Sequence, residues 1–170
     1  MNKKTFLWIA GTFIITSSCC LLVFLAWYFL SGTSKYDISS KDELKDIVIE
    51  QTYPEMVALG EVFPFEIRIT NTAQEPQVLD SIDFAVTYLE GITVNDSSPE
   101  TKWVRKGDSQ FPFDSFQYNK EIPANGSLVV RFDMTGSKPG RYLGTVFICV
   151  NNPTLCNFYM IKTEVKSGEI

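Results

Sequence analysis

Histidine is absent from the 170 residues of this chain, and its absence removes several kinds of active site. Catalytic triads that depend on a histidine base are excluded, and so are zinc sites of the HExxH type. The sequence also has no glycine-rich loop followed by a lysine, of the kind that holds phosphate groups. No carboxylate spacing requires two acidic side chains to meet as an acid–base pair. We therefore predict a protein that is not an enzyme and that holds no cofactor and no metal ion.

Positive charge is also scarce, with 15 Lys and Arg against 20 Asp and Glu and a formal net charge of −5. Nucleic-acid binding needs clustered lysine and arginine that displace counterions from the phosphates, so we exclude nucleic acid as a partner. The composition is not that of a disordered chain, because 45% of the residues are hydrophobic and 14% are aromatic. The sequence therefore predicts a folded, acidic protein.

Charged residues are missing from 5–30, a run of 26 residues that follows Lys4. A helix of that length extends about 39 Å, which exceeds the roughly 30 Å hydrocarbon core of a bilayer. Trp8 and Trp27 lie near its two ends, where amphipathic rings collect at membrane interfaces. We predict that 5–30 is an uncleaved transmembrane signal anchor.

Two other interpretations of this apolar run stay open. A cleaved signal peptide would use Lys3 and Lys4 as its charged region, but its apolar stretch would be about 7–15 residues long, and no A-x-A cleavage site follows. A lipoprotein would be modified at Cys19 or Cys20, although mostly apolar residues follow these two cysteines.

The short tail 1–4 carries two lysines and is easily retained in the cytoplasm. We predict that the polar segment 31–45 is a linker and that 46–170 form an extracytoplasmic domain in the periplasm or at the cell surface. Without Lys3 and Lys4, the outer part of the chain carries 13 positive and 20 negative charges, a net charge of −7.

Apolar residues recur at every second position in the outer domain, which is the period of a half-buried β-strand. The segment 63–69 shows this alternation most clearly. Turn-forming residues separate the candidate strands, and no amphipathic helix of ten or more residues interrupts them. The predicted fold is an all-β antiparallel sandwich. Further strands are expected at 82–88, 128–134, 142–150 and 156–165, with weaker candidates at 47–52 and 116–122.

Three segments carry a resemblance to a known family. Gly60–Thr72 is similar to the F-x-I-x-I-x-N-T/G strand of bacterial Ig-like domains of the CARDB and NEW3 type. Ile122–Ser127 and Pro139–Tyr142 resemble the turns that open two later strands of these domains. The resemblance covers about 50–166 and implies an Ig-like sandwich of about seven strands that serves as an adhesion, spacer or assembly module. It also implies that Tyr142, at the start of the penultimate strand, bonds back to nearby backbone.

Two cysteines flank the turn of the last predicted hairpin. A turn centred on Asn152-Pro153 places Cys149 and Cys156 directly opposite each other. The Cα atoms of a non-hydrogen-bonded antiparallel pair lie about 4.5 Å apart, within reach of a disulfide. We predict this disulfide, which would persist only in an oxidising compartment. Two reduced thiols or a metal site are the alternatives, although no histidine and no second cysteine pair could complete a zinc site.

Both faces of the last hairpin are apolar, and only one of them can face the core. One face carries Phe147, Phe158 and Met160. Either the segment 102–121 folds over this face as a lid, or the face is a docking surface for a second protein or a second copy of the chain.

A second group of aromatic residues falls between Trp103 and Tyr118. These rings either fold inward as core and lid or present a surface to a sugar or a protein. The complete candidate interaction surface therefore consists of Phe147, Phe158, Met160, Trp103, Phe111 and Phe113.

These patterns together predict a non-catalytic, single-pass membrane protein. It would present an Ig-like binding, spacer or assembly domain at the cell envelope, with the membrane and a further protein as partners. The alternatives are an extracytoplasmic assembly or metal-delivery factor, and a carbohydrate-binding module with a glycan as its ligand.

Overall fold

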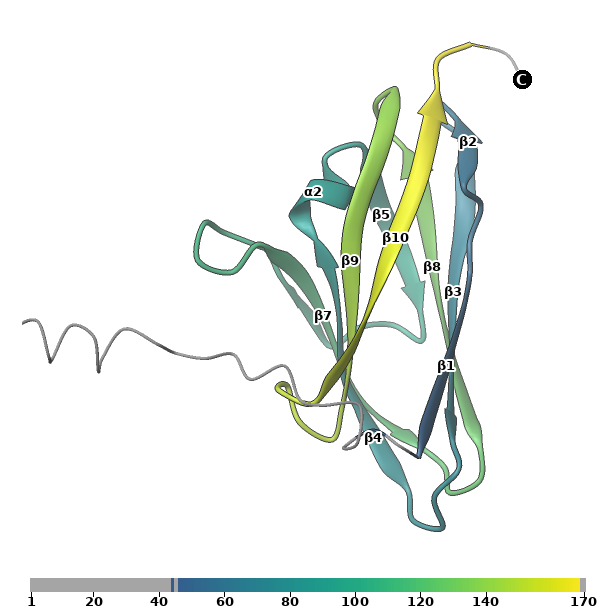
Figure 1. Ribbon diagram of the computed structural model, residues 1–170, viewed down its shortest axis with the longest axis vertical. Helices are drawn as coiled ribbons and strands as arrows, with labels where there is room; N and C mark the ends of the chain where they lie inside the picture. The colour runs from purple at the N-terminus through teal and green to yellow at the C-terminus, as the bar shows by residue number, and fades with distance from the viewer. Residues whose placement is uncertain (1–43, 45, 169–170) are drawn as a thin grey trace, which may run out of the picture. The chain divides into compact units, whose positions relative to one another are not determined.

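The computed structural model describes residue 44 and residues 46–168. The predicted tail 1–4, the predicted membrane segment 5–30 and nearly all of the predicted linker 31–45 lie outside the described residues. Within the described part of the chain, no helix is both long enough and apolar enough to cross a membrane. The described residues form two β-sheets with a shared core (Figure 1).

One sheet has four strands in the order β1-β3-β8-β5, and the other has six in the order β2-β10-β9-β4-β7-β6. Pairing between the described strands is antiparallel except that β2 runs parallel to β10. The strands are β1 (Ile47–Thr52), β2 (Met56–Ala58), β3 (Val62–Asn71), β4 (Gln77–Ala85), β5 (Ile92–Ser98), β6 (Trp103–Arg105), β7 (Phe113–Ile122), β8 (Ser127–Gly136), β9 (Gly140–Val150) and β10 (Cys156–Lys166).

This strand order is that of an Ig-like sandwich. The four-stranded sheet corresponds to the A-B-E-D order of immunoglobulin domains, and β10-β9-β4 correspond to G-F-C, with β7 and β6 extending that sheet. The predicted all-β sandwich is confirmed, but the described chain has ten strands and not about seven. The strands that the sequence did not reveal are β2 and β6, which are three residues long, and β5, which a bulge interrupts.

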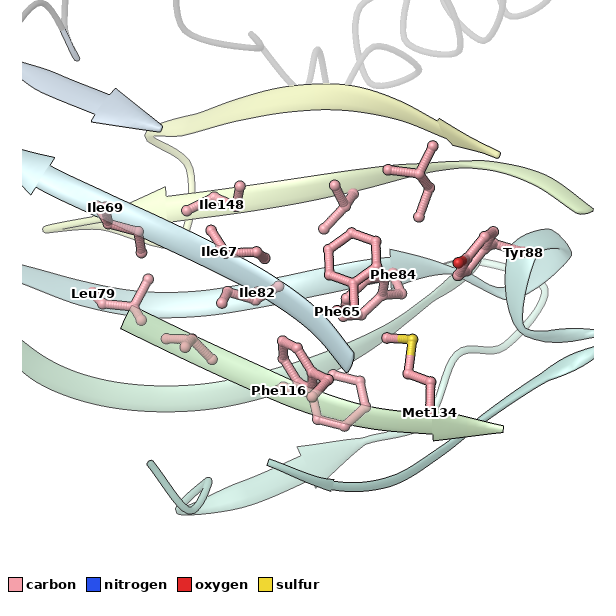
Figure 2. Packing of buried hydrophobic residues seen from close by; sticks show 14 of the residues in the cluster. Phe65, Ile67, Ile69, Leu79, Ile82, Phe84, Tyr88, Phe116, Met134 and Ile148 are labelled. Carbon is pink, nitrogen blue, oxygen red and sulfur yellow. The ribbon is translucent and has the colours of Figure 1, made fainter. Parts of the chain in front are cut away.

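The core is built around Phe84 of β4 (Figure 2). Its ring meets Phe65 of β3, Phe116 of β7 and Phe132 of β8 edge to face, with centroid separations of 5.4, 5.9 and 5.1 Å. These four side chains come from both sheets, so the contacts join the two layers. Burial of each such ring contributes about 1.5–3 kcal/mol to the free energy of folding.

The chain leaves β4 after Ala85 and forms one helical turn, α2 (Val86–Leu89). The prediction that the strand continues through Val86 and Tyr88 is therefore wrong. The backbone N–H of Val86 donates to the carbonyl of Pro112 at 3.0 Å, and the hydroxyls of Tyr88 and Thr163 are hydrogen-bonded at 2.9 Å. Burial raises the pKa of Tyr88 to about 12. The turn lets the chain pass from β4 in one sheet to β5 in the other.

Tyr142 near the start of β9 forms the backbone contact that the family resemblance implied. Its hydroxyl donates to the carbonyl of Pro139 at 3.3 Å. The ring lies directly over Gly91, where an added Cβ atom would stand 1.8 Å from Cζ of Tyr142. Glycine at position 91 therefore makes room for the tyrosine ring.

Candidate functional site

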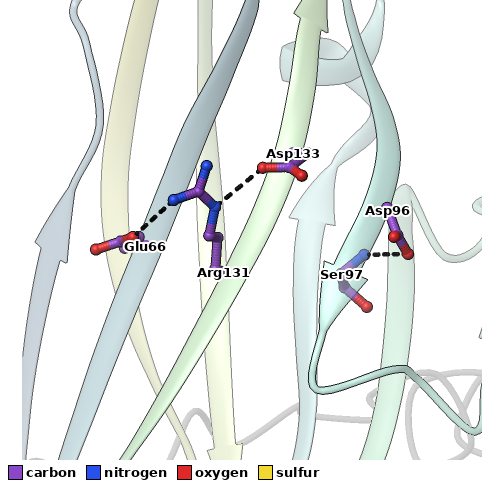
Figure 3. A network of polar contacts seen from close by, with 5 residues as sticks. All are labelled: Glu66, Asp96, Ser97, Arg131 and Asp133. Carbon is purple, nitrogen blue, oxygen red and sulfur yellow. Dashed lines mark hydrogen bonds and ion pairs between the residues drawn. The ribbon is translucent and has the colours of Figure 1, made fainter.

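The outward face of the four-stranded sheet carries ion pairs (Figure 3), with the exposed residues Val48, Val62 and Val129 between them. Arg131 pairs with Asp133 on its own strand at 3.0 Å and with Glu66 on β3 at 3.4 Å. Arg68 and Glu50 form a further pair across β3 and β1 at 3.9 Å. Exposed pairs of this kind contribute about 0–1 kcal/mol each, and they mark a surface that stays in water.

The outward face of the six-stranded sheet is apolar, and we call it the apolar face. Its most exposed members are Met160 (68%), Leu143 (57%), Phe158 (55%) and Trp103 (55%). The other side of the hairpin formed by β9 and β10 faces the core. Its residues there are almost completely buried: Val146, Ile148, Val150 and Ile161. The apolar face is made of Trp103, Phe111, Phe113, Leu143, Phe147, Phe158 and Met160.

Four of the predicted surface residues form a continuous row of rings. Phe111 contacts Phe113 with a centroid distance of 5.6 Å, Phe113 contacts Phe147 at 5.0 Å, and Phe147 contacts Phe158 at 6.0 Å. The row connects the loop before β7 with β7, β9 and β10. Trp103 lies on β6 at the edge of the same sheet. The lid interpretation holds only in part, because Phe113 packs against Phe147 while Phe158 stays exposed.

Hydrogen bonds hold the loop between β6 and β7 in a defined shape. The carboxylate of Asp114 accepts bonds from Lys106 Nζ at 2.6 Å and from the backbone N–H of Gly107 at 2.9 Å. The backbone N–H groups of Phe111 and Gln110 donate to Asp108, and they lower the pKa of that carboxyl.

The guanidinium of Arg105 lies 4.5 Å from the centroid of the Phe111 ring, a cation–π contact. Phe111 and Phe113 are thus presented by an ordered loop. Phe116 and Tyr118, which the sequence grouped with them, are buried in the core instead, since their positions on β7 face inward.

The predicted disulfide between Cys149 and Cys156 is confirmed. The S–S distance is 2.01 Å and the Cα atoms are 4.0 Å apart. The adjacent N–H of Val150 donates to the carbonyl of Leu155 at 3.0 Å, so the cysteines occupy the predicted non-hydrogen-bonded position. Because both sulfurs are bonded to each other, neither is a thiolate that could bind a metal. The described residues also contain no cluster of three or more His, Cys, Asp or Glu side chains placed to hold one.

Asp83 lies on the same outward side of the sheet, between Ser115 of β7 and Phe147 of β9. It is only 8% exposed, and its Oδ1 atom has no hydrogen-bond partner in the described chain. Burial raises its pKa, with Asp80 adding to the effect, while Ser115, Ser81 and Arg105 act in the opposite direction. Cys149 Sγ lies 3.9 Å from Oδ2, but a disulfide sulfur has no proton to donate.

The sequence matches no protein-family model and no curated protein. Among solved structures it is similar to the DNA-bound alkylpurine DNA glycosylase AlkC of Pseudomonas fluorescens, with 18% identity over 71% of this chain and a TM-score of 0.43. The chain spans 30% of the length of that protein.

Two shorter domains are also similar. A CARDB domain of Pyrococcus furiosus has 12% identity and a TM-score of 0.43, covering 71% of this chain and 88% of that one. A cupredoxin domain of Nitrosocaldus yellowstonii has 11% identity and a TM-score of 0.47, covering 78% and 92%. At TM-scores below 0.5 these similarities decide nothing about function, and the Ig-like assignment rests on the strand order of this chain.

Proposed function

We propose that this chain is a non-catalytic, single-pass membrane protein whose extracytoplasmic Ig-like domain binds another protein through the apolar face. The observation that carries the proposal is the contrast between the two outward faces of the sandwich. The four-stranded sheet carries ion pairs such as Arg131–Glu66 with small apolar side chains between them, and the six-stranded sheet exposes the large side chains of Phe158 and Met160 over more than half of their surface. Contiguous exposed apolar side chains mark interaction sites in soluble domains.

The construction of the apolar face supports a protein ligand. Large aromatic side chains at the centre of an interface supply most of the binding energy. The loop that carries Phe111 and Phe113 is held by Asp108 and Asp114, so little conformational entropy would be lost when a partner binds.

A sugar ligand fits the rings less well. Successive rings are inclined by 64° between Phe111 and Phe113, 88° between Phe113 and Phe147, and 43° between Phe147 and Phe158. A sugar ring stacks on a flat aromatic surface, which this row does not provide. Within the described residues a metal-delivery role has no thiolate to rely on, because Cys149 and Cys156 are joined.

Two features of the chain support the proposed location of the domain. The Cys149–Cys156 disulfide favours an oxidising compartment, and the uncharged run 5–30 favours a membrane anchor on its N-terminal side.

The proposal is tested by replacing Phe158 and Met160 together with serine in the full chain. A matched control replaces Val48 and Val129, which are exposed on the four-stranded sheet, with serine. Each tagged chain is crosslinked in its native membranes and purified. Partners recovered with the wild type and the control should be lost with the Phe158/Met160 variant. Recovery unaffected by the Phe158/Met160 variant would overturn the proposal.

A further inference from the structure

Edge strands expose unpaired backbone groups, and most edges of this sandwich are protected against pairing with another chain. β2 and β6 are only three residues long. β5 is interrupted by a bulge between Val94 and Asp96. β1 carries Glu50, which pairs with Arg68 on the neighbouring strand. Shortness, bulges and charges of this kind prevent edge-to-edge association.

The outer edge of β10 is long and regular over most of its length, and its one charged side chain there is Lys162, whose Nζ lies 3.8 Å from Oε2 of Glu55. β2 covers it only at Glu164–Lys166, where the N–H of Glu164 donates to the carbonyl of Glu55 at 2.8 Å. Along Cys156–Thr163, no strand of the described chain lies on the side away from β9. The register with β9 is continuous and contains neither a bulge nor a proline.

The hydrogen-bond pattern shows which backbone groups point outward from this edge. Val150 and Leu155 are joined by a backbone hydrogen bond, so every second pair after them is also bonded within the hairpin. Phe158, Met160 and Lys162 fall in the intervening pairs. Their N–H and C=O groups therefore point away from β9, in the same direction as the N–H of Glu164 that already bonds to Glu55. The edge offers an alternating row of donors and acceptors.

We infer that this edge pairs with the same edge of a second copy of the chain, antiparallel and with Met160 opposite Met160 of the other copy. The bonded N–H of Glu164 limits the register on the C-terminal side, and among the registers that remain the one centred on Met160 sets Lys162 beside the Phe158 ring of the other copy. In this register Met160 pairs with Met160 of the other copy, and Phe158 of each copy pairs with Lys162 of the other. These three pairs exchange about six backbone hydrogen bonds. A shift of one residue toward the C-terminus would place Phe158 opposite Glu164, whose N–H is already bonded.

Charge complementarity favours a second copy as the occupant. Lys162, whose Nζ lies 3.8 Å from Oε2 of Glu55 in the single chain, is the charged side chain along the free part of the edge. The two-fold arrangement places it beside the Phe158 ring of the other copy, with no like charge opposite. The side chains at the axis are the two Met160 residues, which are 68% exposed in the single chain. The two six-stranded sheets would become continuous, and the apolar faces of both copies would join at Phe158 and Met160. The inference does not rest on the proposed function, because it concerns the backbone edge.

The test is cysteine crosslinking of the full chain in its native membrane, in a background with Cys19→Ala and Cys20→Ala. A hydrogen-bonded antiparallel pair has Cα atoms about 5.5 Å apart, within the range of a disulfide. Met160→Cys should therefore yield a covalent dimer under mild oxidation. Leu143→Cys, equally exposed but on β9, should remain monomeric. No dimer at Met160→Cys, or equal dimer at Leu143→Cys, would overturn the inference.

A second pair of variants separates edge pairing from face binding. The background chain carries Phe158→Cys and Lys162→Cys, and these two cysteines should form a crosslink between two copies. Adding Met160→Pro removes the outward N–H of residue 160 but no hydrogen bond within the hairpin. It should therefore abolish the crosslink in a folded protein. Met160→Ala trims the side chain, keeps the N–H and should retain the crosslink, although it weakens partner binding through the face. A crosslink that survives Met160→Pro would contradict the inference. If that variant does not fold, the Met160→Cys and Leu143→Cys comparison decides.

Discussion

At the scale of single residues, Asp83 stands out because a buried carboxylate with an unbonded oxygen costs stability. Asp83 occupies an outward position of β4, opposite Phe147 of β9 and next to the sulfur of Cys149. Water does not reach its Oδ1 atom there. Its pKa is raised above the ordinary value of 3.8, chiefly by burial. Folding therefore favours the protonated form of this group.

The pH dependence of stability follows with a definite sign. Between pH 3.8 and the raised pKa, the folded state binds more protons than the unfolded state, so Asp83 lowers the free energy of unfolding as pH rises through that window. Asp83→Asn should remove this contribution. We expect the variant to have a higher free energy of unfolding than the wild type at pH 7, with a difference that shrinks toward pH 4. Urea unfolding at several pH values measures it, and an Asn variant that is less stable at pH 7 would contradict it.

Tyr142 and Gly91 make a coupled pair that can be tested by a double-mutant cycle. Tyr142→Phe loses the hydroxyl bond to Pro139 and should cost about 0.5–1.5 kcal/mol. Gly91→Ala should cost about 1–3 kcal/mol, because the new methyl group would overlap the tyrosine ring. In a Tyr142→Ala background most of the Gly91→Ala cost should disappear, as measured by urea unfolding. If Gly91→Ala costs the same free energy of unfolding with and without the Tyr142 ring, the added methyl group does not contact that ring.

At the scale of elements, the β9–β10 hairpin combines the disulfide, half of the apolar face and the free edge. Its inward residues, such as Ile148 and Ile161, join the core, while Phe147 and Phe158 stay on the outside. The disulfide holds these two strands together beside the Phe147–Phe158 pair.

Removing the disulfide should destabilise the domain without changing its fold. In the chain-entropy description a loop of this size contributes about 2.5 kcal/mol. The variant with Cys149→Ala and Cys156→Ala should therefore unfold at lower urea concentration, and reductant should shift the wild type in the same direction. The variant serves as its own control, since reductant should leave its midpoint unchanged. A wild-type midpoint insensitive to complete reduction would disprove the contribution.

The sequence allowed good prediction of those strands whose two faces differ in polarity. In β3, Phe65 and Ile67 alternate with polar residues because one face is core and the other is water. The disulfide was predictable for a similar reason, since the Asn152-Pro153 turn sets the register that places Cys149 opposite Cys156.

Other features depend on tertiary contacts that alternation does not record. Tyr88 continues the alternation of β4 but sits on a helical turn, because the chain must cross to the other sheet there. Phe113 and Phe116 both lie on β7 and are three residues apart, so they point to opposite faces, but the sequence did not show that the strand begins as early as Phe113. The burial of Asp83 was not predictable, because it results from Phe147 and Ser115 on neighbouring strands.

At the scale of the whole molecule, the two outward faces of one sandwich have opposite character. The four-stranded sheet carries ion pairs on its outward face, and the six-stranded sheet exposes Phe158, Met160, Leu143 and Trp103, which is the contrast on which the proposed protein binding rests. The sequence adds the uncharged run 5–30, which lies outside the described residues, and a net charge of −7 over 31–170. A membrane anchor would restrict the domain to two dimensions, which raises its effective concentration toward partners in the same membrane.

The topology of the full chain is the prediction with the widest consequences. If 5–30 is an uncleaved anchor with the tail 1–4 in the cytoplasm, the intact mass should include the N-terminal residues, and the protein should need detergent for extraction. Protease added to intact cells or spheroplasts should digest the Ig-like domain and leave a cytoplasmic marker protein whole. A shortened mature chain would indicate a cleaved signal peptide, and an added lipid mass at Cys19 or Cys20 would indicate a lipoprotein. A domain protected in sealed spheroplasts but digested after lysis would show the reverse orientation, and the Cys149–Cys156 bond would then lie in a reducing compartment where such bonds are rare.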